Sequence, residues 1–327
     1  MRQTSGSGVS HLAKSIELDL RKRETGLQKA HIPALADLAS CALTTRSVNS
    51  SEWIVQLPRT NCNREAKERY IMRFLANKLV YPHKVIAGFV PQLLGQLSEH
   101  GETVVLMLDQ SKIADGFECL MVSARFAERA LPVAWRVVET KGPIGFEVQE
   151  ELLNAVLAML PREFSVLLSA DRFYGTSALI DWCQKHEWQY RIRLKGNLTL
   201  QHEGGELTTG EAVSLGMNAL KDAQLGQVTT PIGIIHEADD PEAWIIAMDC
   251  EPTKGRTLDY GMRWGIEALF SDLKSRGFGI TQTHLKQADR IERLLLVLAV
   301  ATYWAVSTAL VIRNKPKKHS PKKLDAA

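Results

Sequence analysis

The chain has 327 residues, of which 45% are hydrophobic and 24% charged, a balance typical of a globular protein that excludes general disorder. This length allows two or more domains. Its five cysteines are scattered without a Cys-X-X-Cys pair, which argues against a disulfide framework or a zinc ribbon. The first 30 residues contain no apolar run, so no secretory signal is expected.

The net charge of +3 is unevenly distributed along the chain. Residues 1–100 contain 14 Lys and Arg against 8 Asp and Glu, and residues 313–327 contain six against one. Residues 101–312 contain the remaining 20 against 28. Two basic ends around an acidic middle fit a nucleic-acid-binding protein with carboxylates at its centre. They also fit a solvated surface followed by a disordered tail, and charge alone leaves both open.

Residues 1–30 are mostly polar, and apolar residues at helical spacing begin at Ile32. This spacing predicts helices over residues 32–43, 53–57 and 64–79. The polar break at Ser47–Ser51 offers Ser or Asn as an N-cap for the second helix. Three short helices in a basic region are typical of a helix-turn-helix-like DNA-binding module. A plain helical subdomain explains the pattern equally well.

Two apolar runs predict buried central strands, and an aspartate stands at or directly after the end of each run. The first run covers residues 103–109 and ends in Asp109, while the second covers 164–170 and precedes Asp171. Further strands are predicted at 117–123, 131–138 and 188–194, and helices at 146–160 and 177–186. Three strands, a helix, a strand, a helix and a strand form the order of a ribonuclease-H-like α/β fold.

Residues 196–259 differ from the rest because Gly-rich turns separate short β-prone runs. They contain 11 Asp and Glu against three Lys and Arg. We expect a β-rich insertion here. The resulting scheme is a helical region at 1–100, a core at 101–195 and 260–312 around the insertion at 196–259, and a basic, disordered tail at 313–327.

Helical spacing returns from Leu258 to Lys274. At about 100° per residue, one face of this helix carries four polar side chains, and another face is apolar and suited to pack on a sheet. The polar four are Tyr260, Arg263, Glu267 and Lys274. Such a face commonly forms a surface ion-pair ladder, but it could equally present one metal ligand between two phosphate-binding groups. Strand-end aspartates likewise serve as turn residues or as ligands in a crevice.

The spacing Tyr-X2-Arg-X3-Glu-X6-Lys, together with Asp109 and Asp171, resembles the DDE transposases of the insertion-sequence-4 group. Three further segments resemble the same family, and the resemblance covers about residues 31–312. These segments are Leu108–Ser111, Ala170–Gly175 and Arg46–Ser51, the last of them similar to the family's helical DNA-binding region.

The resemblance implies a ribonuclease-H-like catalytic core with a β-rich insertion before the last catalytic helix, preceded by a helical DNA-binding region. Its catalytic and metal-binding residues would be Asp109, Asp171 and Glu267, holding two Mg²⁺ ions for which Mn²⁺ can substitute. Its DNA-binding residues would be Tyr260, Arg263 and Lys274, with Arg172, Arg193 and Lys195 as further candidates.

The activity implied is metal-dependent cleavage at transposon ends followed by strand transfer into target DNA, in the bacterial cytoplasm and on the nucleoid. The partners implied are terminal inverted repeats and target DNA, bound by a homodimer. Two alternatives remain open: a nuclease of the same fold without strand transfer, and a truncated or domesticated remnant that binds DNA without catalysis. The chain turns into a basic tail where family members usually continue, which suits the remnant.

The uncharged stretch at 294–312 is long enough for a membrane span. Polar residues interrupt it, however, and a helix buried against a large sheet is also apolar all round. We therefore expect a buried C-terminal helix and no membrane partner. Trp244, in an apolar run of the insertion, is open to two interpretations, as a core residue or as a base-contacting aromatic.

Overall fold

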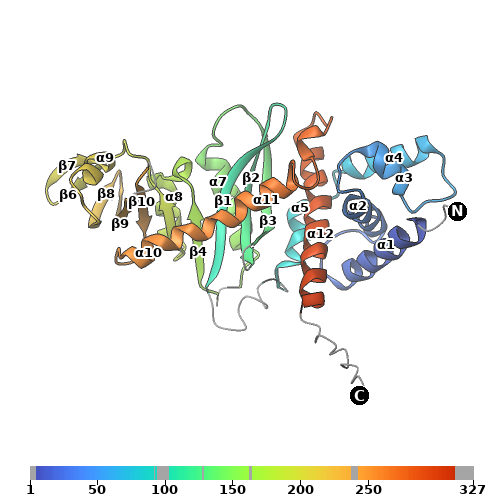
Figure 1. Cartoon of the computed structure of the whole chain (residues 1–327), viewed down its shortest axis with the longest axis horizontal. Coiled ribbons are helices and arrows are strands. Elements are labelled where there is room, and N and C mark those ends of the chain that lie inside the picture. The colour runs from blue at the N-terminus through green and yellow to red at the C-terminus, as the bar shows by residue number, and fades with distance from the viewer. Residues whose placement is uncertain are drawn as a thin grey trace, which may run out of the picture.

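The computed structural model describes residues 5–91, 93, 103–126, 129–161, 164–236 and 242–313. Within them the chain forms an elongated α/β molecule with helices at one end and a mixed sheet along the rest (Figure 1). The basic tail predicted from residue 313 onward lies, after Arg313, outside the described residues.

The N-terminal end is helical. Its helices are α1 (Ser5–Lys22), α2 (Ile32–Thr45), α3 (Ser50–Gln56), α4 (Arg64–Leu75) and α5 (Pro82–Ala87). The side chains of Asn49 and Asn63 cap α3 and α4, each accepting a 2.9 Å hydrogen bond from a backbone N–H of the first turn. Helix α1 was not predicted, although Val9, Ile16 and Leu20 are buried at helical spacing among polar residues.

One sheet runs through the molecule in the order β3-β2-β1-β4-β5-β10-β9-β8-β6-β7. Strands β1, β2 and β3 pair antiparallel, whereas β4 is parallel to both β1 and β5. Their bounds are β1 Val104–Ala114, β2 Phe117–Phe126, β3 Arg129–Glu139, β4 Val166–Ala170 and β5 Gln189–Arg193. The turn between β1 and β2 contains Gly116 at a φ of 78°, a conformation that favours glycine.

The strands of residues 196–259 extend this sheet, because β10 pairs antiparallel with the edge of β5. They are β6 Thr199–His202, β7 Gly205–Thr208, β8 Ala219–Leu225, β9 Val228–Ile235 and β10 Trp244–Met248, with α9 (Thr209–Ser214) between β7 and β8. The expectation that this segment is rich in β-strands is therefore met within the described residues.

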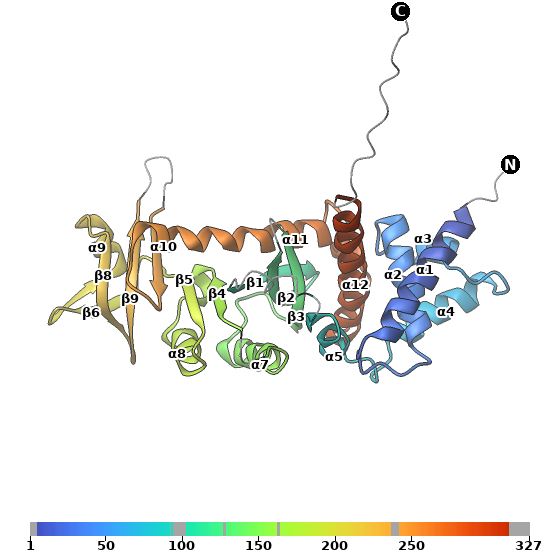
Figure 2. The ribbon, with the colours of Figure 1, turned by 90° about the horizontal axis from the view of Figure 1, so that it is seen from below.

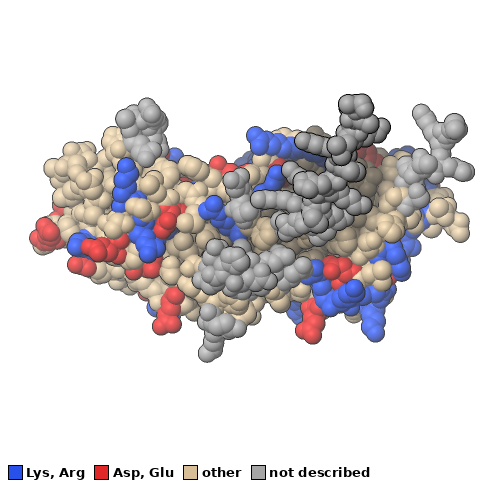
Figure 3. Space-filling model, turned by 60° about the horizontal axis from the view of Figure 1, so that its bottom comes forward, with Lys and Arg blue, Asp and Glu red and all other residues tan. Residues whose placement is uncertain are grey.

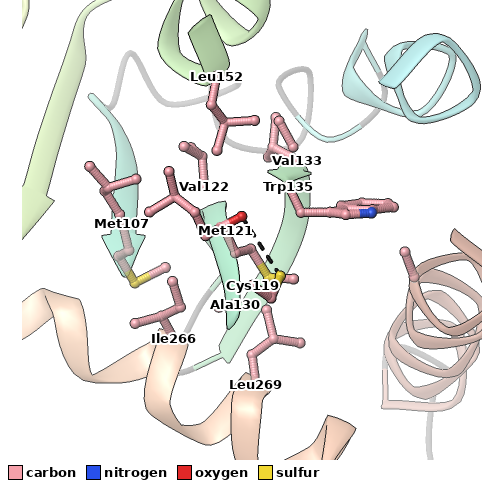
Figure 4. Close-up of a cluster of buried hydrophobic side chains, with 14 of the residues drawn as sticks. Met107, Cys119, Met121, Val122, Ala130, Val133, Trp135, Leu152, Ile266 and Leu269 are labelled. Atoms are coloured by element: carbon pink, nitrogen blue, oxygen red, sulfur yellow. Dashed lines mark hydrogen bonds between the residues drawn. The ribbon is translucent and has the colours of Figure 1, made fainter. Parts of the chain in front are cut away.

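Helices cover both faces of the sheet (Figure 2). On one face lie α7 (Phe146–Leu157) and α8 (Ser177–Lys185). On the other lies a continuous helical rod of α10 (Lys254–Leu258), the 3-10 segment η2 (Asp259–Trp264) and α11 (Gly265–Leu273). In Figure 4, Leu152 of α7 lies beside Val122 and Val133, while Ile266 and Leu269 of α11 lie across the strands beside Met107 and Ala130.

Helix α12 (Ala288–Arg313) stands between the N-terminal helices and the sheet (Figure 1). It contacts α2 and α4 on one side, and α5 and β3 on the other (Figure 2). Residues 294–301 are all buried, and Tyr303 donates a 3.0 Å hydrogen bond to the Pro132 carbonyl of β3. Ala305 and residues 307–309 are exposed, so burial ends earlier than the predicted 294–312.

Length and composition alone would allow residues 288–309 to cross a membrane, yet 61% of the most apolar window is buried inside the protein. The α2 and β3 contacts account for this apolar character, because a helix covered on two sides has no polar face to present there.

Candidate active site

Two neighbouring parallel strands bring the two aspartates together. Leu108 of β1 lies opposite Ala170 of β4, so the next residues, Asp109 and Asp171, lie side by side. The prediction that the strand ends at Asp109 is wrong: β1 continues to Ala114 because its hairpin partner β2 pairs with it throughout. Asp171 does follow the end of its strand. The two aspartates are neighbours because of the parallel register of β1 and β4, although Asp109 lies within its strand and Asp171 lies after the end of its strand.

The loop after β4 fixes the Asp171 carboxylate. Asp171 begins the 3-10 segment η1 (Arg172–Tyr174), and its Oδ1 accepts a 2.6 Å hydrogen bond from the backbone N–H of Arg172. Gly175 closes this loop against β5. A Cβ at that position would lie 2.4 Å from the Arg193 carbonyl oxygen, so only glycine allows this close approach.

The third group comes from the helical rod across the sheet. Tyr260 and Arg263 lie in η2, Glu267 lies in the first turn of α11, and Lys274 follows its last turn. The sequence predicts regular helical spacing through this segment, whereas the structure tightens it to 3-10 geometry before Gly265. The four side chains nevertheless all reach toward β1 and the end of β4.

Arg263 is the centre of this cluster. Its Nη1 donates to Asp109 Oδ2 at 3.0 Å and its Nη2 donates to Glu267 Oε1 at 2.5 Å. Its Nε donates to the Tyr260 hydroxyl at 3.1 Å, and that hydroxyl donates in turn to Asp171 Oδ1 at 3.3 Å. The structure therefore connects all three predicted carboxylates through one guanidinium and one phenol.

Burial sets the protonation of this cluster. It raises the pKa of the Asp109 carboxyl to about 6, against the opposing effect of Arg263. Burial also raises the pKa of the Tyr260 phenol to about 12, so Tyr260 remains a hydrogen-bond donor at neutral pH. Burial lowers the pKa of Arg263, but Tyr260 and the surrounding carboxylates outweigh this effect, and the net pKa is raised. Asp109 is thus a carboxylate held in a poorly solvated position.

Lys274 reaches the neighbouring part of β1, where its Nζ donates to the Ser111 hydroxyl. Burial lowers the pKa of Lys274, while Glu118 and Asp109 raise it in part. A tight turn holds Lys274 at the end of α11, because the N–H of Phe278 donates to the Asp272 carbonyl at 2.9 Å. A Cβ on Gly277 would lie 2.1 Å from that carbonyl oxygen, which requires glycine there.

The other predicted DNA-binding residues line a pocket of about 490 Å³ next to Asp171. Arg172 and Arg193 both donate to Glu242, at 2.5 and 3.3 Å, just before β10. Lys195 lies 5.3 Å from the ring centroid of Phe173, which is itself 56% exposed. The structure brings these three cations together, with two of them partly neutralised by one carboxylate.

Trp244 packs edge-to-face on Tyr260 at 5.3 Å and on Trp264 at 5.8 Å between ring centroids. Sequence reasoning assigned no role to Ser111, Glu242 or Trp264. The sequence could have pointed to Ser111, because it follows Asp109 by two residues on the same strand and therefore lies on the same face of the sheet. No local pattern in the sequence points to Glu242, since its partner Arg172 lies 70 positions away.

The donor chemistry of the site fits a hard divalent cation, which prefers carboxylate oxygens. The geometry of the described residues does not: no three His, Cys, Asp or Glu side chains among them converge on one point suited to a metal ion. The Arg263 guanidinium stands between Asp109 and Glu267 and occupies oxygens that a cation would need.

Part of the chain matches a known protein family, and the matched part contains most of the residues described above. Residues 147–304, just under half of the chain, match the family model of the transposase DDE domain. Asp171, Tyr260, Arg263, Glu267 and Lys274 lie inside the matched segment, and Asp109 lies before it. Among curated proteins, none matches the chain.

Proposed function

We propose that this chain is a DDE-type insertion-sequence transposase of the insertion-sequence-4 group, which cleaves DNA at the ends of its element and transfers them into target DNA. The observation that carries the proposal is the connection of Asp109, Asp171 and Glu267 through Arg263 and Tyr260. Three carboxylates from two adjacent strands and one helix are otherwise costly to gather in a half-buried site.

The strand order supports a ribonuclease-H-like core. Strands β3, β2 and β1 are antiparallel, β4 and β5 follow in parallel, and the acids lie on β1, after β4 and on α11. On this proposal the core comprises residues 101–195 and 260–312, residues 196–259 form the insertion, and residues 1–100 form the DNA-binding region.

The cofactor of this proposal is a pair of Mg²⁺ ions, or Mn²⁺ in their place, held by Asp109, Asp171 and Glu267. When bound, such ions would lower the pKa of a water or 3′-hydroxyl nucleophile and would stabilise the charge on the leaving oxygen. Tyr260, Arg263 and Lys274, helped by Arg172, Arg193 and Lys195, would bind the phosphates on either side of the cut.

Charge supports DNA as the partner. Figure 3 shows Lys and Arg side chains at the N-terminal helical end. Within the N-terminal helices, Arg64, Arg69 and Arg73 of α4 are exposed. Such a patch binds phosphates with a salt-dependent affinity. We place the protein in the bacterial cytoplasm, acting as a homodimer on paired terminal repeats.

Cleavage of a duplex that carries the inverted repeat flanking the reading frame tests the proposal. Asp109→Asn, Asp171→Asn and Glu267→Gln should each reduce Mg²⁺-dependent cleavage about 100-fold or more, because each removes a metal-binding charge while keeping the side-chain shape. DNA binding should change little. Asp115→Asn is the matched control, since Asp115 is 93% exposed in the β1–β2 turn.

The products distinguish the alternatives. A transposase joins the cleaved 3′ ends to a second DNA, whereas a nuclease of the same fold only cuts. A remnant binds the repeat without cutting. Wild-type cleavage by any of the three variants would remove that residue from the site.

A further inference from the structure

Arg263 is committed to the interior of the site. All three of its guanidinium nitrogens donate to groups of the cluster, and its side chain is 7% exposed. Three of its five N–H groups are engaged within the cluster and the side chain is almost fully buried, so in this arrangement little of the guanidinium is accessible to a phosphate outside the site. The geometry therefore differs from the phosphate-binding role expected from the sequence.

The same guanidinium opposes a divalent cation. It hydrogen-bonds one oxygen each of Asp109 and Glu267, and its positive charge would lie beside any ion that entered between them. Like charges at such separations repel strongly in a poorly solvated site. A cation and Arg263 in its present position therefore compete for the same two carboxylates.

We infer that Arg263 is the internal counter-ion of the DNA-free site, and that divalent ions bind only when a DNA phosphate draws Arg263 away from Asp109 and Glu267. This inference rests on the proposed function. It makes Arg263 the residue that couples metal binding to DNA binding. In the DNA-free protein, Asp109 and Glu267 would pair with Arg263 and would bind no metal ions.

The structure offers a route for this exchange. Glu267 is 56% exposed, so the Arg263–Glu267 pair lies at the open side of the site, whereas Asp109 is 18% exposed and lies deeper. A phosphate arriving at the open side would offer the guanidinium a bidentate partner that a planar fork binds well. Asp109 and Glu267 would then be free to bind cations.

Titration of the DNA-free protein with Mn²⁺, followed by calorimetry at pH 7.5, tests the inference without any measurement of cleavage. Arg263→Gln should bind Mn²⁺ at least tenfold more tightly than the wild type, because it removes the competing charge. Asp109→Asn introduced into Arg263→Gln should abolish that binding. Arg276→Gln is the matched control, since it removes an exposed arginine of the same charge beyond α11 and should leave the wild-type affinity unchanged.

Arg263→Lys protects the test against a folding defect in Arg263→Gln, and circular dichroism should establish that each variant is folded. A lysine ammonium cannot bridge Asp109 and Glu267 as a planar fork does, so its Mn²⁺ affinity should lie between those of the wild type and Arg263→Gln. Mn²⁺ binding by the wild type as tight as by folded Arg263→Gln and Arg263→Lys would overturn the inference but leave the proposed function intact. An absence of binding in all of them would also overturn the inference, and the cleavage assay would then decide the proposed function separately.

Discussion

Asp109 lies in the middle of a paired strand, and its surroundings set the electrostatics of the site. Its carboxylate receives a backbone hydrogen bond from Gln110 and an ion pair from Arg263, yet burial still raises its pKa to about 6. The ionised form is therefore less favourable in the folded chain than in the unfolded chain. Buried carboxyl groups with a raised pKa are common at functional sites.

This pKa predicts how stability depends on pH. The folded pKa of about 6 exceeds the ordinary 3.8, so the folded state binds more protons between these values, and the contribution of Asp109 to stability falls as pH rises through that range. Asp109→Asn should raise the free energy of unfolding by roughly 1–3 kcal/mol at pH 7.5 and by less at pH 4.5. Urea unfolding with a chelator at both pH values measures it.

An equal effect of Asp109→Asn at the two pH values would contradict this prediction. Asp115→Asn serves again as the control, because the exposed Asp115 should change the free energy of unfolding by less than about 0.5 kcal/mol at either pH.

Among the elements, α12 changes environment along its length. Residues 294–301 are buried between α2 and β3, while Ala305, one helical turn after Ala301, is exposed. The two alanines have the same size and the same helix propensity, so a substitution at each separates burial from local preference.

Ala301→Asp should destabilise the protein by about 3 kcal/mol or more, because it buries an unpaired carboxylate. Ala305→Asp should change stability by less than about 0.5–1 kcal/mol, since its carboxylate stays in water. Denaturant unfolding followed by tryptophan fluorescence compares them. Similar losses in both variants would show that the last turns of α12 are buried in solution.

At the scale of the whole molecule, α12 joins the helical N-terminal end to the sheet. Arg293 donates to the Leu75 carbonyl of α4, and Trp135 of β3 donates to the Glu292 carbonyl at 3.1 Å. The apolar stretch at 294–301 therefore forms one core with both regions. The DNA-binding region and the catalytic core that we propose share this core.

A variant lacking residues 1–100 should consequently aggregate or bind a hydrophobic dye, because it exposes the α2-facing side of α12 at a cost of roughly 25 cal/mol per Å² of apolar surface. Size-exclusion chromatography and dye fluorescence test this. A monomeric, cooperatively unfolding product would show that the N-terminal helices are an independent domain.

The sequence by itself predicted most of the helices and strands, and it singled out the side chains that the structure brings together around Arg263. Apolar runs predicted β1 and β4, and helical spacing placed Tyr260, Arg263, Glu267 and Lys274 on one face, because these patterns depend on neighbours within a few residues. The local pattern did not predict features that depend on contacts between distant segments. The extent of β1 depends on β2, and the 3-10 geometry before Gly265 depends on packing against the sheet.

Only the tertiary structure decided which partner each charged group takes. Arg263 and Glu267 are four residues apart and predictable as a pair, but Arg263 and Asp109 are 154 apart, and Arg172 and Glu242 are 70 apart. No local spacing encodes these contacts, since they follow from parallel strand register and from the placement of the helical rod across the sheet. That placement turns the predicted phosphate-binding arginine inward, onto the carboxylates.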